Sequence, residues 1–224
     1  MRIATTVTAV LASVLLGTAT AQAATWSSSD QWAEWSTGGY TVRQDCWASN
    51  HGPETIYANS SSNFWVDSTQ PATDGVKCYP HSARNVGRTL SSLATLTSSF
   101  NVTLPGSGVY NAAYDIWANS NAYEVMIWEN RVTAGPLGSK QTTASIGGVS
   151  YDVYRGNNGH EVYSFVRGNV TSGGVDILSV LKWLRSNGWW GDVTLGEVQF
   201  GFEISSTGGA TERFTTNSYS VSFS

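Results

Sequence analysis

The stretch Tyr123–Trp128, with the sequence YEVMIW, decides the fold class. Successive side chains of a β-strand point to opposite faces of the sheet, so this stretch has two distinct faces. One face carries Tyr123, Val125 and Ile127, and the other carries Glu124, Met126 and Trp128. The first set belongs in a hydrophobic core. The second places a carboxylate between large, partly apolar neighbours, which is typical of the floor of a groove.

Similar short strands follow one another along the chain, separated by Gly, Asn, Ser and Pro. Examples of the predicted strands are 40–44, 100–104, 112–117, 123–128, 151–154, 162–166, 198–204 and 219–223. This pattern indicates an all-β sandwich or barrel. One segment, 175–185, instead places Ile177, Val180, Leu181 and Leu184 at helical spacing, with Asp176 near its start. It predicts one short amphipathic α-helix packed against a sheet.

Two further strands carry acids beside unusual neighbours. Residues 198–204 alternate between a core-like set and the set Gln199, Gly201 and Glu203, in which Gly201 would leave room for a ligand. Residues 113–117 place Asp115 and Trp117 on one face. Three carboxylates therefore lie on strand faces that could line one concave sheet.

The three acids have two interpretations. Most acids on half-exposed strands are simply solvated. Here they stand beside Met, Trp, Gln and Gly rather than Lys, Thr and Ser, which favours a site. Glycoside cleavage needs such a pair, because one carboxylate attacks or stabilises the anomeric carbon while a protonated acid releases the leaving oxygen.

The composition suits an uncharged ligand with flat apolar faces, such as a sugar. Charged residues are 12% of the chain, aromatic residues are also 12%, and the formal net charge is −4. With three lysines, there is no basic footprint for nucleic acid or an acidic membrane. No motif indicates a cofactor, so we expect none. Trp and Tyr also simply favour strands and β cores, so the composition alone is a weak argument.

The first residues have the pattern of a secretory signal peptide. Arg2 precedes the apolar run 9–16, and Ala21-Gln22-Ala23 has the small-x-small pattern of a cleavage site. We therefore expect 1–23 to be a signal peptide and 24–224 to be a single domain of a secreted, extracellular monomer. No other stretch is apolar enough to cross a membrane.

Two cysteines, Cys46 and Cys78, accompany this export signal. A single disulfide is the default expectation for an exported chain with one pair. A zinc site would need more cysteines or clustered histidines, whereas the three histidines are far apart in sequence, so no metal is expected.

Several motifs, in order along the chain, resemble glycoside hydrolase family 12, the small endoglucanases and xyloglucanases. Residues 109–117 resemble the family's YNxxYDIW strand, and 123–128 resemble YE(I/L)MIW. Residues 135–139 resemble the GPIGS cord that crosses the cleft, and 199–203 resemble QFGTE. The resemblance implies a β-jelly-roll sandwich of two antiparallel sheets with a concave substrate cleft and one short α-helix.

The resemblance also implies roles for matching residues. Glu124 would be the nucleophile, Glu203 the general acid/base, and Asp115 would share a hydrogen bond with Glu124. Trp47 would stack on a sugar ring in a distal subsite, although a core position near a disulfide is its alternative. The remaining residues expected to contact a β-glucan are Asp45, Met126, Trp128, Trp117, Pro136, Asn158 and Gln199.

Three departures from the family pattern affect this site. Asp45 and Ala48 stand where the family has Asn and Gly, Ile204 stands where a proline usually follows the acid/base, and both cysteines occupy unexpected positions. A bridge between them would tie two strands together near one end of the cleft.

The sequence leaves more than one function open. The leading hypothesis is a retaining endo-β-1,4-glucanase, and a xyloglucan-specific enzyme of the same family is its closest alternative. A family 11 xylanase shares the two-glutamate logic. A non-catalytic carbohydrate-binding β-sandwich would explain the aromatic residues but not two acids on groove-facing positions.

Overall fold

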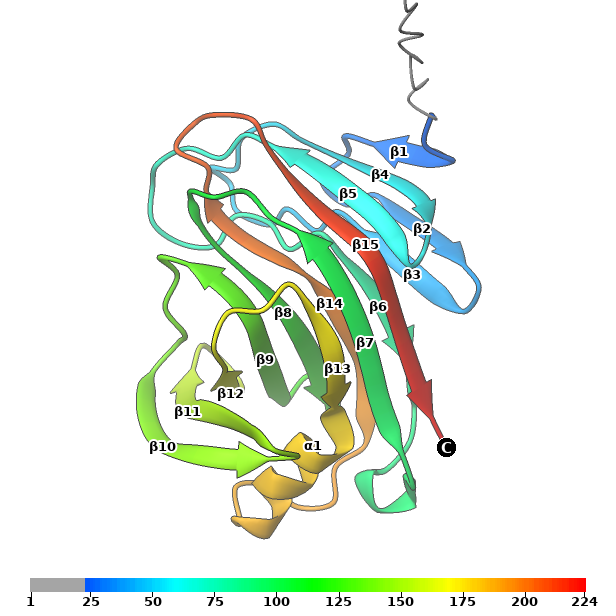
Figure 1. The fold of residues 1–224 in the computed structure, drawn as a ribbon, viewed down its shortest axis with the longest axis vertical. Coiled ribbons are helices and arrows are strands. Elements are labelled where there is room, and N and C mark those ends of the chain that lie inside the picture. The colour runs from blue at the N-terminus through cyan, green and yellow to red at the C-terminus, as the bar shows by residue number, and fades with distance from the viewer. Residues whose placement is uncertain (1–22) are drawn as a thin grey trace, which may run out of the picture.

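The computed structural model describes residues 23–224, which form two curved sheets packed face to face (Figure 1). In spatial order, the six-stranded sheet contains β1 (Trp26–Ser28), β4 (Glu54–Ser60), β5 (Asn63–Ser68), β15 (Glu212–Phe223), β7 (Leu96–Thr103) and β13 (Ser172–Asp176). The nine-stranded sheet contains β10 (Ser139–Ile146), β11 (Val149–Asn157), β12 (Glu161–Val166), β9 (Tyr123–Val132), β8 (Val109–Ala118), β14 (Leu195–Ser206), β6 (His81–Asn85), β3 (Tyr40–Arg43) and β2 (Glu34–Thr37). This is the predicted all-β sandwich of jelly-roll type.

The core between the sheets confirms the alternation predicted from the sequence. Val125 and Ile127 of β9 are fully buried in the main core, whereas Met126 and Trp128 pack on the opposite face in a small separate cluster. Aromatic rings join the two sheets: Phe200 of β14 lies 5.2 Å from Phe100 of β7, centroid to centroid. The apolar half of each strand therefore fixes which residues remain for the outer, concave face.

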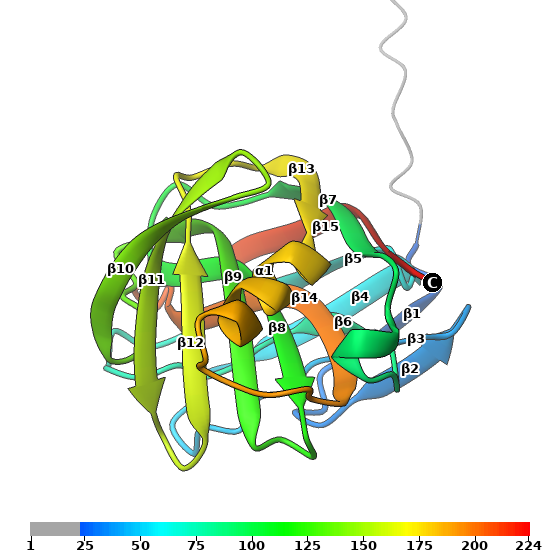
Figure 2. The same ribbon diagram turned by 90° about the horizontal axis from the view of Figure 1, so that it is seen from below.

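The predicted helix is α1 (Ile177–Ser186), beside the 3₁₀ turn η1 (Leu90–Ser92). It begins two residues later than predicted because Asp176 is its N-cap, whose side chain accepts a hydrogen bond from the Ser179 amide at 3.1 Å. All four predicted apolar positions of the helix are buried. Viewed from below, the helix lies across one end of the sandwich (Figure 2).

The pairing of β9 with β12 is parallel, whereas the other paired strands within residues 23–224 are antiparallel. Its register sets Glu161 beside Tyr123 and Val162 beside Glu124. The turn before β12 therefore lies at the same end of the sheet as the start of β9.

The predicted disulfide joins Cys46 and Cys78, and both residues are fully buried. It does not tie two strands together as expected, because Cys46 follows β3 and Cys78 precedes β6. Cys78 forms an isolated antiparallel bridge with Ile204 of β14, whose amide donates to the Cys78 carbonyl at 3.0 Å. A proline at 204 would lack this N–H donor. Ile204, which stands where the family usually has proline, therefore allows this backbone hydrogen bond.

Removing this disulfide is expected to lower stability substantially. It closes a loop with a sequence separation of 32 residues, a restriction of the unfolded chain that contributes about 3 kcal/mol. For a domain of this size, the double variant Cys46→Ala/Cys78→Ala should have a Tm lower by about 6–12 °C. Calorimetry with and without a phosphine reductant checks this. The reductant should lower the Tm of the native protein but not that of the variant. Equal Tm values for the two proteins without reductant would contradict the expectation.

The predicted signal peptide lies almost wholly outside the described residues. Within 23–224, no helix has both the length and the apolar character needed to cross a membrane.

Candidate active site

Three neighbouring strands of the nine-stranded sheet each supply one acid to a single cleft. Asp115 comes from β8, Glu124 from β9 and Glu203 from β14. The cleft holds about 440 Å³. Its lining residues are Asp45, Trp47, Tyr79, Asp115, Trp117, Asn121, Glu124, Asn158, His160, Gln199 and Glu203.

The curvature of the sheet brings Glu124 and Glu203 to the same cleft. Across β8, Glu124 pairs with Trp117 and Glu203 pairs with Asn111, two positions six residues apart. On a flat strand this offset would span about 20 Å. The long strands of this sheet are bent instead (Figures 1 and 2), and a bulge interrupts the β8–β9 register at Ala112/Ala113. Both acids therefore line the same cleft.

Glu203 is held with an elevated proton affinity. Burial, the largest cause, and the charge of Glu124 raise the pKa of Glu203 to about 7, against the lowering effect of a hydrogen bond from Asn111. Asn111 is the direct cross-strand partner of Glu203, and its Nδ2 donates to Glu203 Oε2. A carboxyl group in this state can donate a proton near neutral pH.

Glu124 has a different environment, because a base touches it. Burial raises the pKa of Glu124, while the hydrogen bond and the charge of His160 lower it. His160 Nε2 lies 2.6 Å from Glu124 Oε2. Sequence reasoning missed His160, since only the parallel β9–β12 pairing brings the turn before β12 to this carboxylate.

Asp115 lies buried between the other two acids. Burial raises the pKa of Asp115 well above its usual range, with further contributions from the charges of Glu124 and Glu203. Within residues 23–224, Asp115 and Glu124 do not form the expected hydrogen bond: Asp115 Oδ1 has no hydrogen-bond partner, and Glu124 Oε2 contacts His160 instead. A raised pKa favours the neutral acid, and a neutral Asp115 places less negative charge beside Glu124.

One end of the cleft is aromatic and exposed. Trp47 is 47% exposed, which excludes the alternative of a core position, and lines the cleft with Asp45. Asp45 has a positive φ of 50° and also lines a shallow groove with Trp32, which is 55% exposed. Trp32 was not predicted, because its surrounding sequence carries no strand alternation.

The other predicted contact residues divide into two groups. Trp117, Asn158 and Gln199 line the cleft. Met126 and Trp128 are only 4% and 3% exposed, and Trp128 Nε1 donates to Met126 Sδ at 3.4 Å. Trp128 also borders a second hollow, beyond Glu203.

The segment 135–139, expected to form a cord across the cleft, meets the second hollow only at its first residue, Gly135. Ala134 and Gly135 line it together with Glu203 and Asn111. Pro136 lines neither this hollow nor the cleft. Glu203 therefore borders both the cleft and this second hollow.

The prediction for Gly201 was wrong. A Cβ at this position would overlap the Pro80 carbonyl oxygen and the backbone of His81. Gly201 therefore allows the segment before β6 to pack closely on β14, and the space beside it is not open to a ligand.

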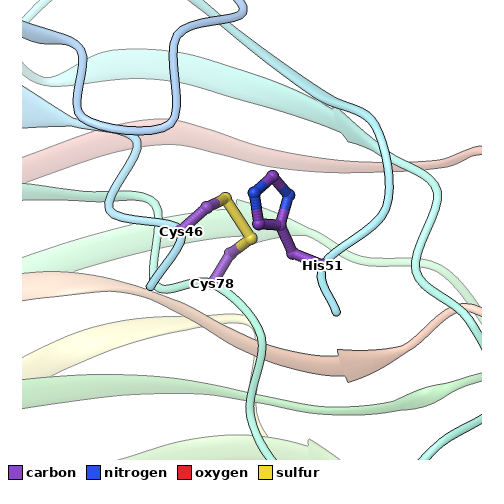
Figure 3. A group of neighbouring side chains, drawn as sticks. All are labelled: Cys46, His51 and Cys78. Atoms are coloured by element: carbon purple, nitrogen blue, oxygen red, sulfur yellow. A yellow bond between two sulfur atoms is a disulfide. The ribbon is translucent and has the colours of Figure 1, made fainter. Parts of the chain in front are cut away.

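A group of possible metal ligands, Cys46, His51 and Cys78, lies beside this segment (Figure 3). Both sulfur atoms belong to the disulfide, so the oxidised pair offers no thiolate. The His51 ring nitrogens lie 2.9 Å from the Gly52 carbonyl oxygen and 3.2 Å from Gln31 Oε1.

Known proteins share both this sequence and this fold. The family model described as Glycosyl hydrolase family 12 matches residues 5–224. A probable xyloglucan-specific endo-beta-1,4-glucanase A from Aspergillus fumigatus is 32% identical over 92% of this chain and 95% of its own. Endoglucanase S from Pectobacterium parmentieri is 30% identical over 88% of this chain and 87% of its own.

Solved structures of family 12 enzymes have the same fold as this chain. The xyloglucanase domain of NopAA, a type three effector from Sinorhizobium fredii in complex with cellobiose, has a TM-score of 0.86 at 37% identity, covering 89% of this chain and 99% of its own. The family 12 xyloglucanase from Bacillus licheniformis has a TM-score of 0.80 at 27% identity, covering 89% and 100%. These matches decide against family 11 and against a non-catalytic sandwich: the chain belongs to glycosyl hydrolase family 12.

Proposed function

We propose that this chain is a secreted, retaining endo-β-1,4-glucanase with Glu124 as nucleophile and Glu203 as general acid/base. The observation that carries the proposal is that these two acids line one cleft from separate strands in different electrostatic environments. Glu203 is the better proton donor, since its pKa is raised to about 7. Glu124 is the better anion, since His160 opposes the effect of its burial.

The reaction would proceed in two balanced steps. In the first, a Glu124 oxygen bonds to the anomeric carbon, the glycosidic C–O bond breaks, and the Glu203 proton goes to the leaving oxygen. In the second, Glu203 takes a proton from water, the water oxygen bonds to the anomeric carbon, and the ester bond to Glu124 breaks. Retaining enzymes hold the two carboxyl groups about 5–5.5 Å apart, and we expect that spacing around a bound sugar.

Supporting features concern the polymer and the compartment. The exposed Trp47 offers a flat apolar face for a pyranose ring at one end of the cleft. Relatives named as endo-β-1,4-glucanases favour an internal β-1,4 bond as the target. The Cys46–Cys78 disulfide favours an oxidising compartment, as does the leader-like sequence at 1–23.

Xyloglucan is the second candidate substrate. The proteins similar to this chain include several named as specific for xyloglucan. Asp45, which replaces the Asn expected at this end of the cleft, changes the polar contacts available to a glucose hydroxyl.

A substrate panel tests the function. Initial rates on barley β-glucan, carboxymethylcellulose and xyloglucan, with product lengths, should show internal cleavage of at least one of them. Proton NMR of the first products should show the β-anomer. Products released only from chain ends would contradict the endo assignment, and an initial α-anomer would contradict retention.

The pH dependence of kcat/KM is expected to be bell-shaped. Glu203 must be protonated to act as an acid, so the rate should fall as pH rises above about 7. Glu124 must be ionised, so the rate should also fall at low pH. Because burial raises the pKa of Glu124, this fall should begin at a higher pH than for an ordinary glutamate. The apparent pKa values of the acid and alkaline limbs belong to the interacting pair Glu124 and Glu203 together. Full activity at pH 9 on an unmodified glucan would contradict the role of Glu203.

A further inference from the structure

The turn between β11 and β12 delivers a base to the proposed nucleophile. In the parallel pair, Val162 lies beside Glu124 and shares its face of the sheet. His160 is two residues before Val162, so period-two alternation puts His160 on that same face. An antiparallel β12 would instead place this turn at the far end of β9.

Two contacts fix the imidazole ring. Its Nε2 lies 2.6 Å from Glu124 Oε2, and its ring packs edge-to-face on Trp117, with centroids 4.9 Å apart. Trp117 is also the direct cross-strand partner of Glu124. The three side chains therefore form one packed unit, in which His160 contacts a single carboxylate oxygen.

The electrostatic setting of His160 is otherwise acidic. Glu124 from β9, Asp115 from β8 and Glu203 from β14 all line the cleft, as do Asp45 and Tyr79 from the segments before and after the disulfide. The adjoining Glu161 is engaged by Arg155 at 2.8 Å. Among the residues lining the cleft, His160 is the only side chain that can carry a positive charge.

We propose that His160 is a positioning residue for Glu124: it holds Oε2, directs Oε1 to the anomeric carbon and favours the carboxylate over the acid. This inference rests on the proposed function. A hydrogen bond to the charged form of a carboxyl favours that form. As the ester forms, Oε2 becomes its carbonyl oxygen, and the same bond then favours return to the carboxylate in the second step.

The test compares His160→Ala with His160→Gln. The alanine variant loses the donor and the charge, so kcat should fall on the order of 10²-fold because Glu124 is no longer held in place. Its acid limb in kcat/KM should move to higher pH, since both contributions that lower the Glu124 pKa are gone. Glutamine keeps a neutral donor but not the charge, so it should restore a large part of kcat at neutral pH, and its acid limb should lie between those of the native enzyme and the alanine variant.

His51→Ala is the matched control, because it removes a histidine outside the cleft lining. Its pH profile should equal that of the native enzyme whatever its Tm. The inference would be overturned if the acid limbs of the kcat/KM profiles of both His160 variants coincided with that of the native enzyme. If Glu124→Gln were fully active as well, the proposed function would also fail; an inactive Glu124→Gln variant would confine the failure to His160.

Discussion

Replacing Glu124 with glutamine is expected to reduce hydrolysis of β-glucan by about 10⁴-fold or more. The amide is nearly isosteric but cannot form the ester with the anomeric carbon, so the covalent route is lost. Folding should be little affected, because the carboxylate contacts His160 at the cleft surface and lies outside the core between the sheets. Initial rates on barley β-glucan, with the Tm of each protein, measure both effects.

Glu212→Gln provides the matched control for this substitution. Glu212 begins β15 on the other sheet and does not line the cleft, so the same chemical change there should leave the rate unaltered. In Glu124→Ala, added azide should occupy the vacated space and give an α-glycosyl azide from an activated β-cellobioside. Near-native hydrolysis by Glu124→Gln would end the assignment of the nucleophile.

Replacing Glu203 with alanine is expected to have the second largest effect, about 10²- to 10⁴-fold on β-glucan. The sugar leaving group is poor and needs the Glu203 proton as its bond breaks. A 2,4-dinitrophenyl cellobioside has a stable leaving anion, so formation of its glycosyl-enzyme should be far less impaired. Pre-steady-state release of dinitrophenol from this substrate measures that step directly.

The second step separates Glu203 from an indirect structural role. Without its base, the glycosyl-enzyme should accumulate, and azide should release it as a β-glycosyl azide, the opposite anomer to that from Glu124→Ala. The alkaline limb near pH 7 should also disappear, because its titrating group is gone. Equal losses on both leaving groups, or an unchanged alkaline limb, would contradict the acid/base role.

The sequence predicted the main strands and the faces of those that carry the acids. Alternation in 123–128 and 198–204 correctly separated core residues such as Ile127 and Phe200 from Glu124 and Glu203. Local periodicity sufficed there because burial of one face leaves no choice of register. Strands that the alternation did not single out, such as β4 and β10, contain many hydroxyl and amide side chains, which also suit loops.

Features set by distant segments could not be predicted in this way. The role of His160 depends on a parallel strand pair, and Gly201 is fixed by the approach of Pro80 and His81 from another part of the chain. The burial of Met126 and Trp128 on the concave face depends on packing with Ala113 and Val166. In each case, period-two alternation gave the face but not what covers it.

The six-residue offset between the cross-strand partners of Glu124 and Glu203 makes the gap between the acids a property of strand shape. Slight straightening of β8 and β14 would widen that gap while preserving every ladder hydrogen bond. Heat should consequently inactivate the enzyme reversibly a few degrees before circular dichroism detects any loss of sheet. Substrate, by bridging the trough, should protect activity in that interval.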